Sequence, residues 1–262
     1  MKDAIYTDRQ IVEIFHIEFL RQFIMKLDRN YYALKGGGNL RLFHQSIRYS
    51  EDMDLDINRE RVSVDKLKKT VMGILEAHSF MSILKTYAID GLVLPNMKTA
   101  KQTTTTQRFK VQLRRRSGID LPTKIEFSGR GLEGNVAVEP VPPPILRPYR
   151  MASMVVPHYD LDSAVLQKMV VLAERAQLQA RDIFDLHLLS SQYTHKDGNV
   201  LKRETIKKAR ERIFMVTFTE FKDVVVSYLS PEDQKIYDSE RMWEDIQLKT
   251  EKFLEEYENG QN

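Results

Sequence analysis

The stretch from Asp52 to Ile57, DMDLDI, alternates acidic and apolar residues without interruption. Successive side chains of a β-strand point to opposite faces, so a period of two predicts a strand here. The three aspartates would share one face, and the three apolar residues would lie in a core on the other. A chain with this strand must form a sheet in which one face packs against an apolar core and the other face carries carboxylates.

Three interpretations of these carboxylates can be compared. A calcium loop of the EF-hand type needs Gly at position 6 and Glu at position 12, but counting from Asp52 these positions hold Ile57 and Ser63. That pattern excludes the calcium loop. A half-exposed strand with a wet acidic face is a second interpretation, although Asp is a poor strand former and like charges on one face repel. A divalent metal site is the third, because Asp52 and Asp54 would lie about 6–7 Å apart along the strand and could hold a hard cation between them.

A run of three glycines, Gly36, Gly37 and Gly38, lies shortly before the aspartates. It follows a short apolar stretch at 31–34, which predicts a strand, and precedes helical spacing at 40–45. Glycines at the start of a helix let backbone N–H groups converge on an anion, although a plain turn uses the same residues. Together with a metal-binding strand, the run favours a nucleoside triphosphate site.

The rest of the chain divides into an α/β half and a helical half. Apolar spacing predicts helices at 6–27 and 64–78 and strands at 82–94, 109–113 and 123–128. Five prolines between 140 and 148 cannot lie inside helices or central strands. We therefore expect an α/β domain over residues 1–139, a proline-rich connector over 140–159 and a helical domain over 160–262.

Composition excludes several classes. The chain has no cysteine, so it forms no disulfide and no thiolate metal site. The N-terminus carries charges within every apolar run and does not look like a signal peptide. No apolar run approaches the roughly 18 residues of a membrane span, so we expect no membrane partner and a cytoplasmic location.

Charge is unevenly distributed. Residues 98–130 contain nine basic and two acidic residues, whereas residues 231–258 contain four basic and ten acidic residues. A basic segment of this kind favours the phosphate backbone of a nucleic acid, and a solubilising hairpin is the alternative. The acidic tail is typical of a solvated helix face, and contact with a protein partner is its alternative.

A second motif lies in the helical half. Lys168 and Arg175 share one helical face at a spacing of i, i+7, and Asp182 and Asp185 are i, i+3 neighbours on the next helix. Surface ion pairs between two amphipathic helices would explain these residues. Beside the glycines and aspartates, we favour Lys168 as a charge-assisted ligand of a triphosphate, with Asp182 positioning either the lysine or a substrate group.

The segments LKGGGNLRLF, RYSEDMDLDI, TKIEFSG and LQKMVVLAERAQLQARDIFDL, in this order, resemble the AbiEii/AbiGii toxin family of the DNA polymerase β-like nucleotidyltransferase superfamily. The resemblance covers roughly residues 30–190. It implies an α+β fold, with a nucleotidyltransferase-type mixed sheet, flanking helices and a helical C-terminal domain that completes the active site. It also implies a toxin of a toxin–antitoxin or phage-abortive system, with NTP as substrate, the tRNA 3′ end or another RNA as acceptor and a cognate antitoxin as partner.

The resemblance assigns roles residue by residue. It implies a site with two Mg²⁺ ions, or Mn²⁺ in their place, and Glu126 as the third acidic residue. Arg181 also matches the second motif, whereas Gly38 and Asn39 stand where the family often has a hydroxyl residue. The implied residues are, for metal, Asp52, Asp54 and Glu126; for catalysis, the same three with Lys168 and Asp182; and for nucleotide binding, Gly36, Gly37, Gly38, Lys168, Arg175 and Asp185.

Three rival functions fit parts of the same pattern. A catalytically inactive scaffold could bind nucleic acid or an antitoxin, a nucleotidyltransferase could modify a protein, and a metal-dependent nuclease needs the carboxylates but no triphosphate cradle. Dependence of turnover on added nucleotide separates a nucleotidyltransferase from a nuclease, and absence of all turnover would favour the inactive scaffold.

Overall fold

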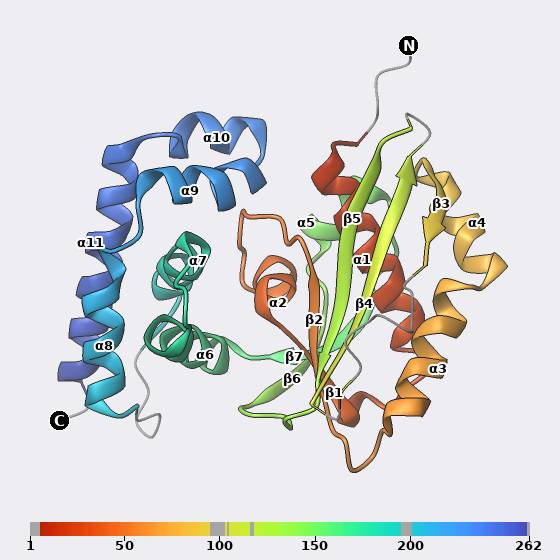
Figure 1. Cartoon of the computed structure of the whole chain (residues 1–262), viewed down its shortest axis with the longest axis horizontal. Helices are drawn as coiled ribbons and strands as arrows, with labels where there is room; N and C mark the ends of the chain where they lie inside the picture. Colours follow the sequence, from red (N-terminus) through yellow and green to blue (C-terminus); the bar gives the residue numbers. More distant parts are fainter. Residues whose placement is uncertain (1–5, 95–102, 104, 116–117, 195–200, 261–262) are drawn as a thin grey trace. The chain divides into compact units, whose positions relative to one another are not determined.

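The computed structural model describes residues 6–94, 103, 105–115, 118–194 and 201–260. The chain divides into two compact units (Figure 1). The sheet unit comprises Met1–Phe43 and Tyr49–Tyr159, and the helical unit comprises His44–Arg48 and Asp160–Asn262. The five residues from 44 to 48 thus interrupt the sheet unit in sequence but belong to the helical unit.

The described part of the sheet unit contains a seven-stranded mixed sheet in the order β3-β4-β5-β2-β1-β7-β6. β2 runs parallel to β5 and antiparallel to β1, and β1 runs parallel to β7. The strands are β1 Tyr32–Lys35, β2 Met53–Ile57, β3 Ile89–Val93, β4 Thr106–Arg115, β5 Asp120–Ser128, β6 Val136–Pro140 and β7 Val155–Tyr159. The helices of this unit are α1 Asp8–Phe23, η1 Arg29–Tyr31, α2 Gly36–Phe43, α3 Val64–Leu75, α4 His78–Thr86, α5 Pro143–Leu146 and η2 Arg147–Tyr149.

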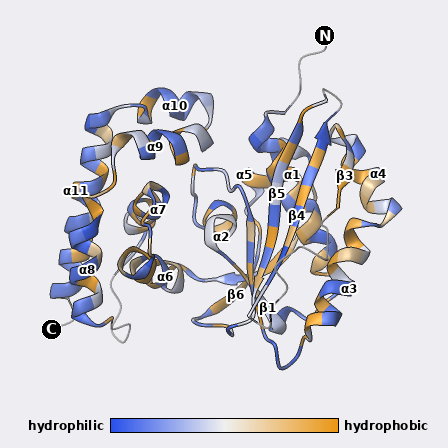
Figure 2. Cartoon of the chain, in the orientation of Figure 1, coloured by the Kyte–Doolittle hydropathy of each residue, from blue (hydrophilic) through white to orange (hydrophobic). Residues whose placement is uncertain are grey.

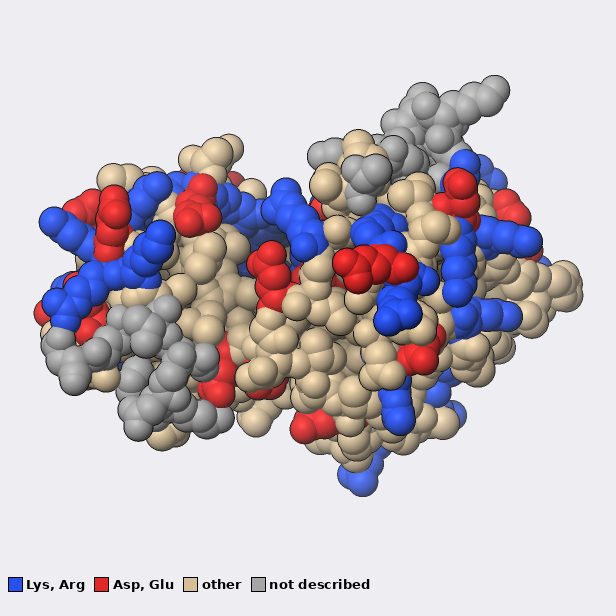
Figure 3. Space-filling model, turned by 90° about the horizontal axis from the view of Figure 1, so that it is seen from below, with Lys and Arg blue, Asp and Glu red and all other residues tan. Residues whose placement is uncertain are grey.

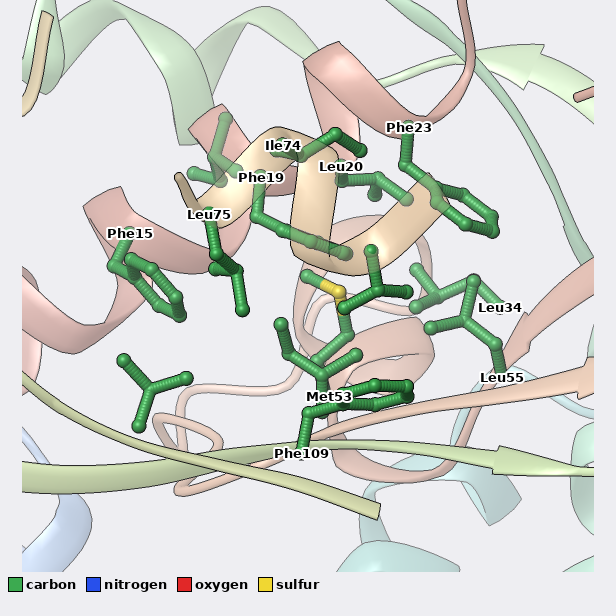
Figure 4. Packing of buried hydrophobic residues seen from close by; sticks show 14 of the residues in the cluster. Phe15, Phe19, Leu20, Phe23, Leu34, Met53, Leu55, Ile74, Leu75 and Phe109 are labelled. Carbon is green, nitrogen blue, oxygen red and sulfur yellow. The ribbon is translucent and has the colours of Figure 1, made fainter. Parts of the chain in front are cut away.

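The apolar core covers one face of the sheet. Apolar and polar residues alternate along β4 and β5, which appear striped in Figure 2. The aromatic side chains of α1 lie against the apolar side chains of the strands, with α3 beside them (Figure 4). α1 itself begins at a capping box, in which the Thr7 hydroxyl accepts from the Gln10 N–H and the Gln10 side chain accepts from the Thr7 N–H. The other face of the sheet is left to polar residues.

The predicted strand at 82–94 is wrong in its first half. Helix α4 extends to Thr86, because Phe80 and Leu84 are spaced by one helical turn and are both buried. Ala88 then adopts a left-handed conformation with φ of 62°, and β3 follows from Ile89.

The expected connector at 140–159 also differs from the structure. Residues in this range form α5, η2 and β7, and the sheet unit extends to Tyr159. The prolines fit because Pro143 occupies the first position of α5, where no N–H is needed. Pro140 lies at the end of the edge strand β6. Proline density therefore marks a local break here and not a linker.

In the described residues of the helical unit, all regular elements are helices, and short connections join them. Arg212 of α8 donates to the carbonyls of Leu172, Ala173 and Arg175 and so satisfies the C-terminal end of α6. None of the helices in the described ranges is long and apolar enough to cross a membrane. The helices are α6 Leu161–Glu174, α7 Ala180–Ser190, α8 Arg203–Ile213, α9 Phe218–Val224, η3 Val226–Tyr228, α10 Pro231–Tyr237 and α11 Glu240–Asn259.

Candidate active site

The sheet unit brings the three predicted metal ligands onto neighbouring strands. β2 buries Met53, Leu55 and Ile57 in the core, so the alternation seen in the sequence is confirmed. Asp54 is the register partner of Glu126 on the parallel strand β5. Asp52 immediately precedes β2 and lies two residues from Asp54, on the same face. Asp54 and Glu126 are thus adjacent in the sheet although they lie 72 positions apart in the sequence.

Basic side chains engage two of these carboxylates. Lys124 Nζ lies 2.7 Å from Asp52 Oδ2, and Arg108 Nε donates to Glu126 Oε2 at 2.6 Å. In the part of the chain that the structure describes, no three His, Asp or Glu side chains are arranged to hold a metal ion. The three acidic residues therefore lie on neighbouring strands, but the side-chain oxygens of Asp52 and Glu126 contact basic residues and do not converge on one point.

The electrostatics of Asp54 fit a divalent cation. Burial, followed by the neighbouring charges of Asp52 and Glu126, raises the pKa of Asp54 to about 6, against the opposing effects of Lys35 and Lys124. A hard cation is stabilised by oxygen ligands of this kind, and it would relieve the repulsion that raises this pKa. The three carboxylates therefore have the oxygen ligands and the negative charge that a divalent cation prefers.

Gly36 connects the glycine run to the acidic strand. It begins α2 with φ of 62°, and a Cβ atom at this position would lie 2.9 Å from Asp54 Oδ2. Only glycine combines this conformation with such a close approach. The run forms the first turn of α2, where backbone N–H groups lack partners within the helix. Gly38 differs from Gly36, because a Cβ there would point toward Leu34 of β1 at 3.6 Å.

Asp56 and Asn39 have structural partners. Asp56 is buried; its Oδ1 lies 2.5 Å from Lys35 Nζ, and its Oδ2 accepts from the Tyr159 hydroxyl at 2.7 Å. The Asn39 amide donates to the Tyr159 carbonyl at 2.9 Å. These contacts tie β1, β2, α2 and β7 together and give the third aspartate of the motif a role in the fold.

The helical unit collects the residues of the second motif in one ion-pair cluster. Lys168 Nζ donates to Asp185 Oδ2 at 2.6 Å and lies 3.5 Å from Asp182 Oδ1. Arg175 donates to Asp182 Oδ2 at 2.5 Å. Both aspartates are buried, so they orient the basic side chains and do not face solvent. Arg181 lies half-buried in the first turn of α7.

Arg48 is a member of this cluster that sequence reasoning missed. It forms a buried, two-pronged pair with Asp185, with Nη2 at 3.0 Å from Oδ2 and Nε at 3.1 Å from Oδ1. Burial opposes ionisation of Asp185, but Arg48 and Lys168 outweigh it and lower the pKa of this carboxyl to about 2. Arg48 lies four residues before Asp52 in a segment with no periodicity, so the sequence carries no local signal for this role.

The predicted basic segment is only partly covered by the structure. Lys98, Lys101 and Arg116 lie outside the described residues. Along β4, the residues Arg108, Lys110 and Arg114 share a face by the strand period, and Lys124 of β5 is the register partner of Lys110. Figure 3 shows basic side chains interspersed with acidic ones over the sheet unit. Strands β4 and β5 thus carry a basic face beside the carboxylates.

Comparison with known proteins gives the class that this fold and site define. The family model described as "Nucleotidyl transferase AbiEii toxin, Type IV TA system" matches residues 18–261. The chain therefore belongs to the AbiEii family of nucleotidyltransferase toxins. The α+β fold predicted from the resemblance and the nucleotidyltransferase assignment are confirmed. Members of this family generally use NTP and a divalent metal.

Two solved structures share the fold. The crystal structure of JHP933 from Helicobacter pylori superposes with a TM-score of 0.52 at 16% sequence identity, over 98% of this chain and 94% of that one. MenT4, a nucleotidyltransferase toxin from Mycobacterium tuberculosis, superposes with a TM-score of 0.54 at 14% identity, over 97% and 94% of the two chains. No curated protein sequence matches the chain.

Proposed function

We propose that this toxin transfers a nucleoside monophosphate from an NTP to the 3′ end of an RNA, with tRNA as the first candidate acceptor, in a Mg²⁺-dependent reaction. One observation carries the proposal: Asp54 and Glu126 are register partners on adjacent parallel strands, and Asp52 precedes them on the same face. A surface strand has no need of three neighbouring carboxylates, one of them with a raised pKa.

In this proposal Asp52, Asp54 and Glu126 hold the metal, with Mn²⁺ as a substitute for Mg²⁺. When bound, a pair of such ions stabilises the attacking and leaving oxygens of an in-line displacement. The 3′ hydroxyl oxygen bonds to the α-phosphorus, the bond from that phosphorus to the bridging oxygen breaks, and pyrophosphate leaves. Glu126 accepts the hydroxyl proton, directly or through one water.

The glycine run and Lys168 bind the phosphates. Backbone N–H groups of Gly36 and Gly37 donate to phosphate oxygens at the start of α2. Lys168 neutralises the pyrophosphate as charge develops on it. Its ammonium group has three N–H donors, and Asp185 and Asp182 are the two carboxylates that contact it among the described residues. A third donor is thus left for a phosphate, and Asp182, which accepts from Arg175, holds the lysine in position.

The basic face of β4 and β5 supports an RNA acceptor, because phosphate backbones bind rows of Lys and Arg. NTP and RNA are both cytoplasmic, so we place the activity there. The family assignment to a toxin–antitoxin system supports a cognate antitoxin as a further partner. A role in phage defence is part of the same proposal.

Label transfer tests the proposal. Purified protein is incubated with Mg²⁺, total RNA and each NTP, labelled in turn at the α- and the γ-phosphate. We expect the α-label and not the γ-label on tRNA-sized RNA, with pyrophosphate released. Label on a protein would support nucleotidyl transfer but contradict the RNA acceptor. RNA cleavage without added NTP would contradict nucleotidyl transfer itself.

A further inference from the structure

Two basic residues occupy the carboxylates that the proposed function assigns to metal. Lys124 contacts Asp52, and Arg108 contacts Glu126, which is its register partner across β4 and β5. The basic side chains of these pairs are 31% and 33% exposed, and both lie on the polar face of the sheet. The contacts are therefore accessible to an incoming ion.

These pairs are easily exchanged. Partly exposed ion pairs contribute little net stability, because water already solvates both groups. A divalent cation interacts with Asp52, Asp54 and Glu126 together, and it also relieves the repulsion around Asp54. When it binds, the two basic side chains lose their carboxylate partners without leaving the site.

The surroundings of the released side chains favour an anion. Lys110 lies directly opposite Lys124, and like charges in that position repel. Arg108 and Arg114 lie on the same face of β4 as Lys110. Loss of the Asp52 contact leaves Lys124 beside a row of cations, which phosphate groups can neutralise.

We propose that Lys124 and Arg108 are exchangeable counter-ions that couple metal binding to RNA binding. Without metal they neutralise Asp52 and Glu126; with metal they bind phosphates of the RNA acceptor. The inference rests on the proposed metal site and RNA acceptor. It adds the direction in which bound metal changes the affinity for RNA. Metal strengthens RNA binding, whereas simple competition of Mn²⁺ for RNA phosphates would weaken it.

The test measures binding without turnover. Fluorescence anisotropy follows a labelled single-stranded oligoribonucleotide, without NTP, in Mn²⁺ or in EDTA at matched ionic strength. Mn²⁺ is expected to lower the RNA Kd roughly tenfold, and by reciprocity RNA raises the Mn²⁺ affinity by the same factor, read by electron paramagnetic resonance. Between about 50 and 200 mM KCl, the salt slope should steepen by about 1.4 with Mn²⁺, since each added single-strand phosphate contact contributes roughly 0.7.

Matched variants identify the residues. Lys124→Met should bind Mn²⁺ more tightly than the wild type when RNA is absent, because a competing cation is gone. It should also lose part of the coupling and about 0.7 of the added salt slope, because Arg108 still contacts Glu126. A variant damaged in folding would not gain metal affinity. Lys110→Met is the control: Lys110 is exposed and contacts no carboxylate in the described ranges. It should weaken RNA binding equally with and without Mn²⁺ and keep the coupling.

The outcomes separate the inference from the proposed function. RNA affinity that Mn²⁺ leaves unchanged or weakens, or full coupling in Lys124→Met, would overturn the inference even while nucleotide transfer to RNA continues. Absence of Mn²⁺ binding by the wild type would overturn both. Mn²⁺ binding that Asp54→Asn removes, together with coupling that Lys124→Met reduces and Lys110→Met does not, would establish the exchange.

Discussion

Arg48 and Asp185 form a two-pronged ion pair in which Arg48 is 5% exposed and Asp185 is fully buried. Arg48 is the last of the five residues that follow α2, His44–Arg48, and these five belong to the helical unit. Asp185 also accepts from Lys168. The residue that orients the candidate phosphate-binding lysine is therefore itself held by an arginine from a distant part of the sequence.

Arg48→Met should destabilise the helical unit strongly. Without Arg48, the buried Asp185 loses its two-pronged partner and keeps the contact with Lys168. Because removing one partner of a buried ion pair costs roughly 3–5 kcal/mol when the other charge is left unpaired, we expect a loss near the lower end, about 3 kcal/mol. Arg175→Met, which breaks a pair whose arginine is more exposed, should cost less. Chemical denaturation followed by circular dichroism measures both. A loss below about 1 kcal/mol for Arg48→Met would contradict a structural role for the buried pair.

Gly36→Ala should impair the site, whereas Gly73→Ala should be harmless. Gly36 has a positive φ and approaches the Asp54 carboxylate, while Gly73 is exposed within α3 with no atom near the added Cβ. We expect Gly36→Ala to lose stability by about 1–2 kcal/mol and nucleotide transfer by at least tenfold. Gly73→Ala should gain about 0.5–1 kcal/mol. Equal turnover in the two variants would argue against the close approach of α2 to Asp54.

How far the sequence predicts this structure depends on the range of the interaction. The strand DMDLDI was predictable because a strict period of two is a local property, and β2 buries the expected residues. The pairing of Asp54 with Glu126 depends on the register of two strands far apart in the chain, so only a family resemblance could suggest it. Arg48 had no local signal, since its partner Asp185 comes from a different element. The second half of α4 was mistaken for a strand because its apolar residues fit either period.

His16 should make stability depend on pH. Its Nε2 lies 2.7 Å from the Thr123 hydroxyl, which donates to the Glu51 carbonyl just before the acidic strand. Nε2 is therefore the donor, and burial favours the neutral form of the ring. Burial lowers the pKa of His16 from 6.5 to about 3, so between these values the unfolded chain binds a proton that the folded protein does not. Stability falls as pH decreases from about 6.5, by about 1.4 kcal/mol per pH unit.

Urea denaturation at two pH values measures this effect. From pH 6.5 to about pH 5, the wild type should lose about 1.6 kcal/mol more than His16→Gln, which has no titrating group at this position. The difference between the proteins isolates His16 from all other titrations. Parallel losses in the wild type and the variant would show that His16 is protonated in the folded protein at these pH values.

The acidic strand β2 carries two aspartates with different roles: Asp54, the proposed metal ligand, and Asp56, which has structural partners. Asp54 lies against Gly36 and beside Glu126, whereas Asp56 is bound by Lys35 and Tyr159. Asp54→Asn and Asp56→Asn are chemically the same change, two residues apart on the same face of β2. Asp56→Asn should cost stability, on the order of 2 kcal/mol, through loss of a charged hydrogen-bond acceptor.

The most direct measurement is therefore the rate of α-label transfer to RNA by these two variants, each normalised to the amount of folded protein. We expect the rate of Asp54→Asn to fall at least a thousandfold, on the order of 4 kcal/mol in transition-state stabilisation, while the rate of Asp56→Asn stays within about threefold of the wild type. Transfer that survives Asp54→Asn, or that fails equally in both variants, would contradict this assignment of roles.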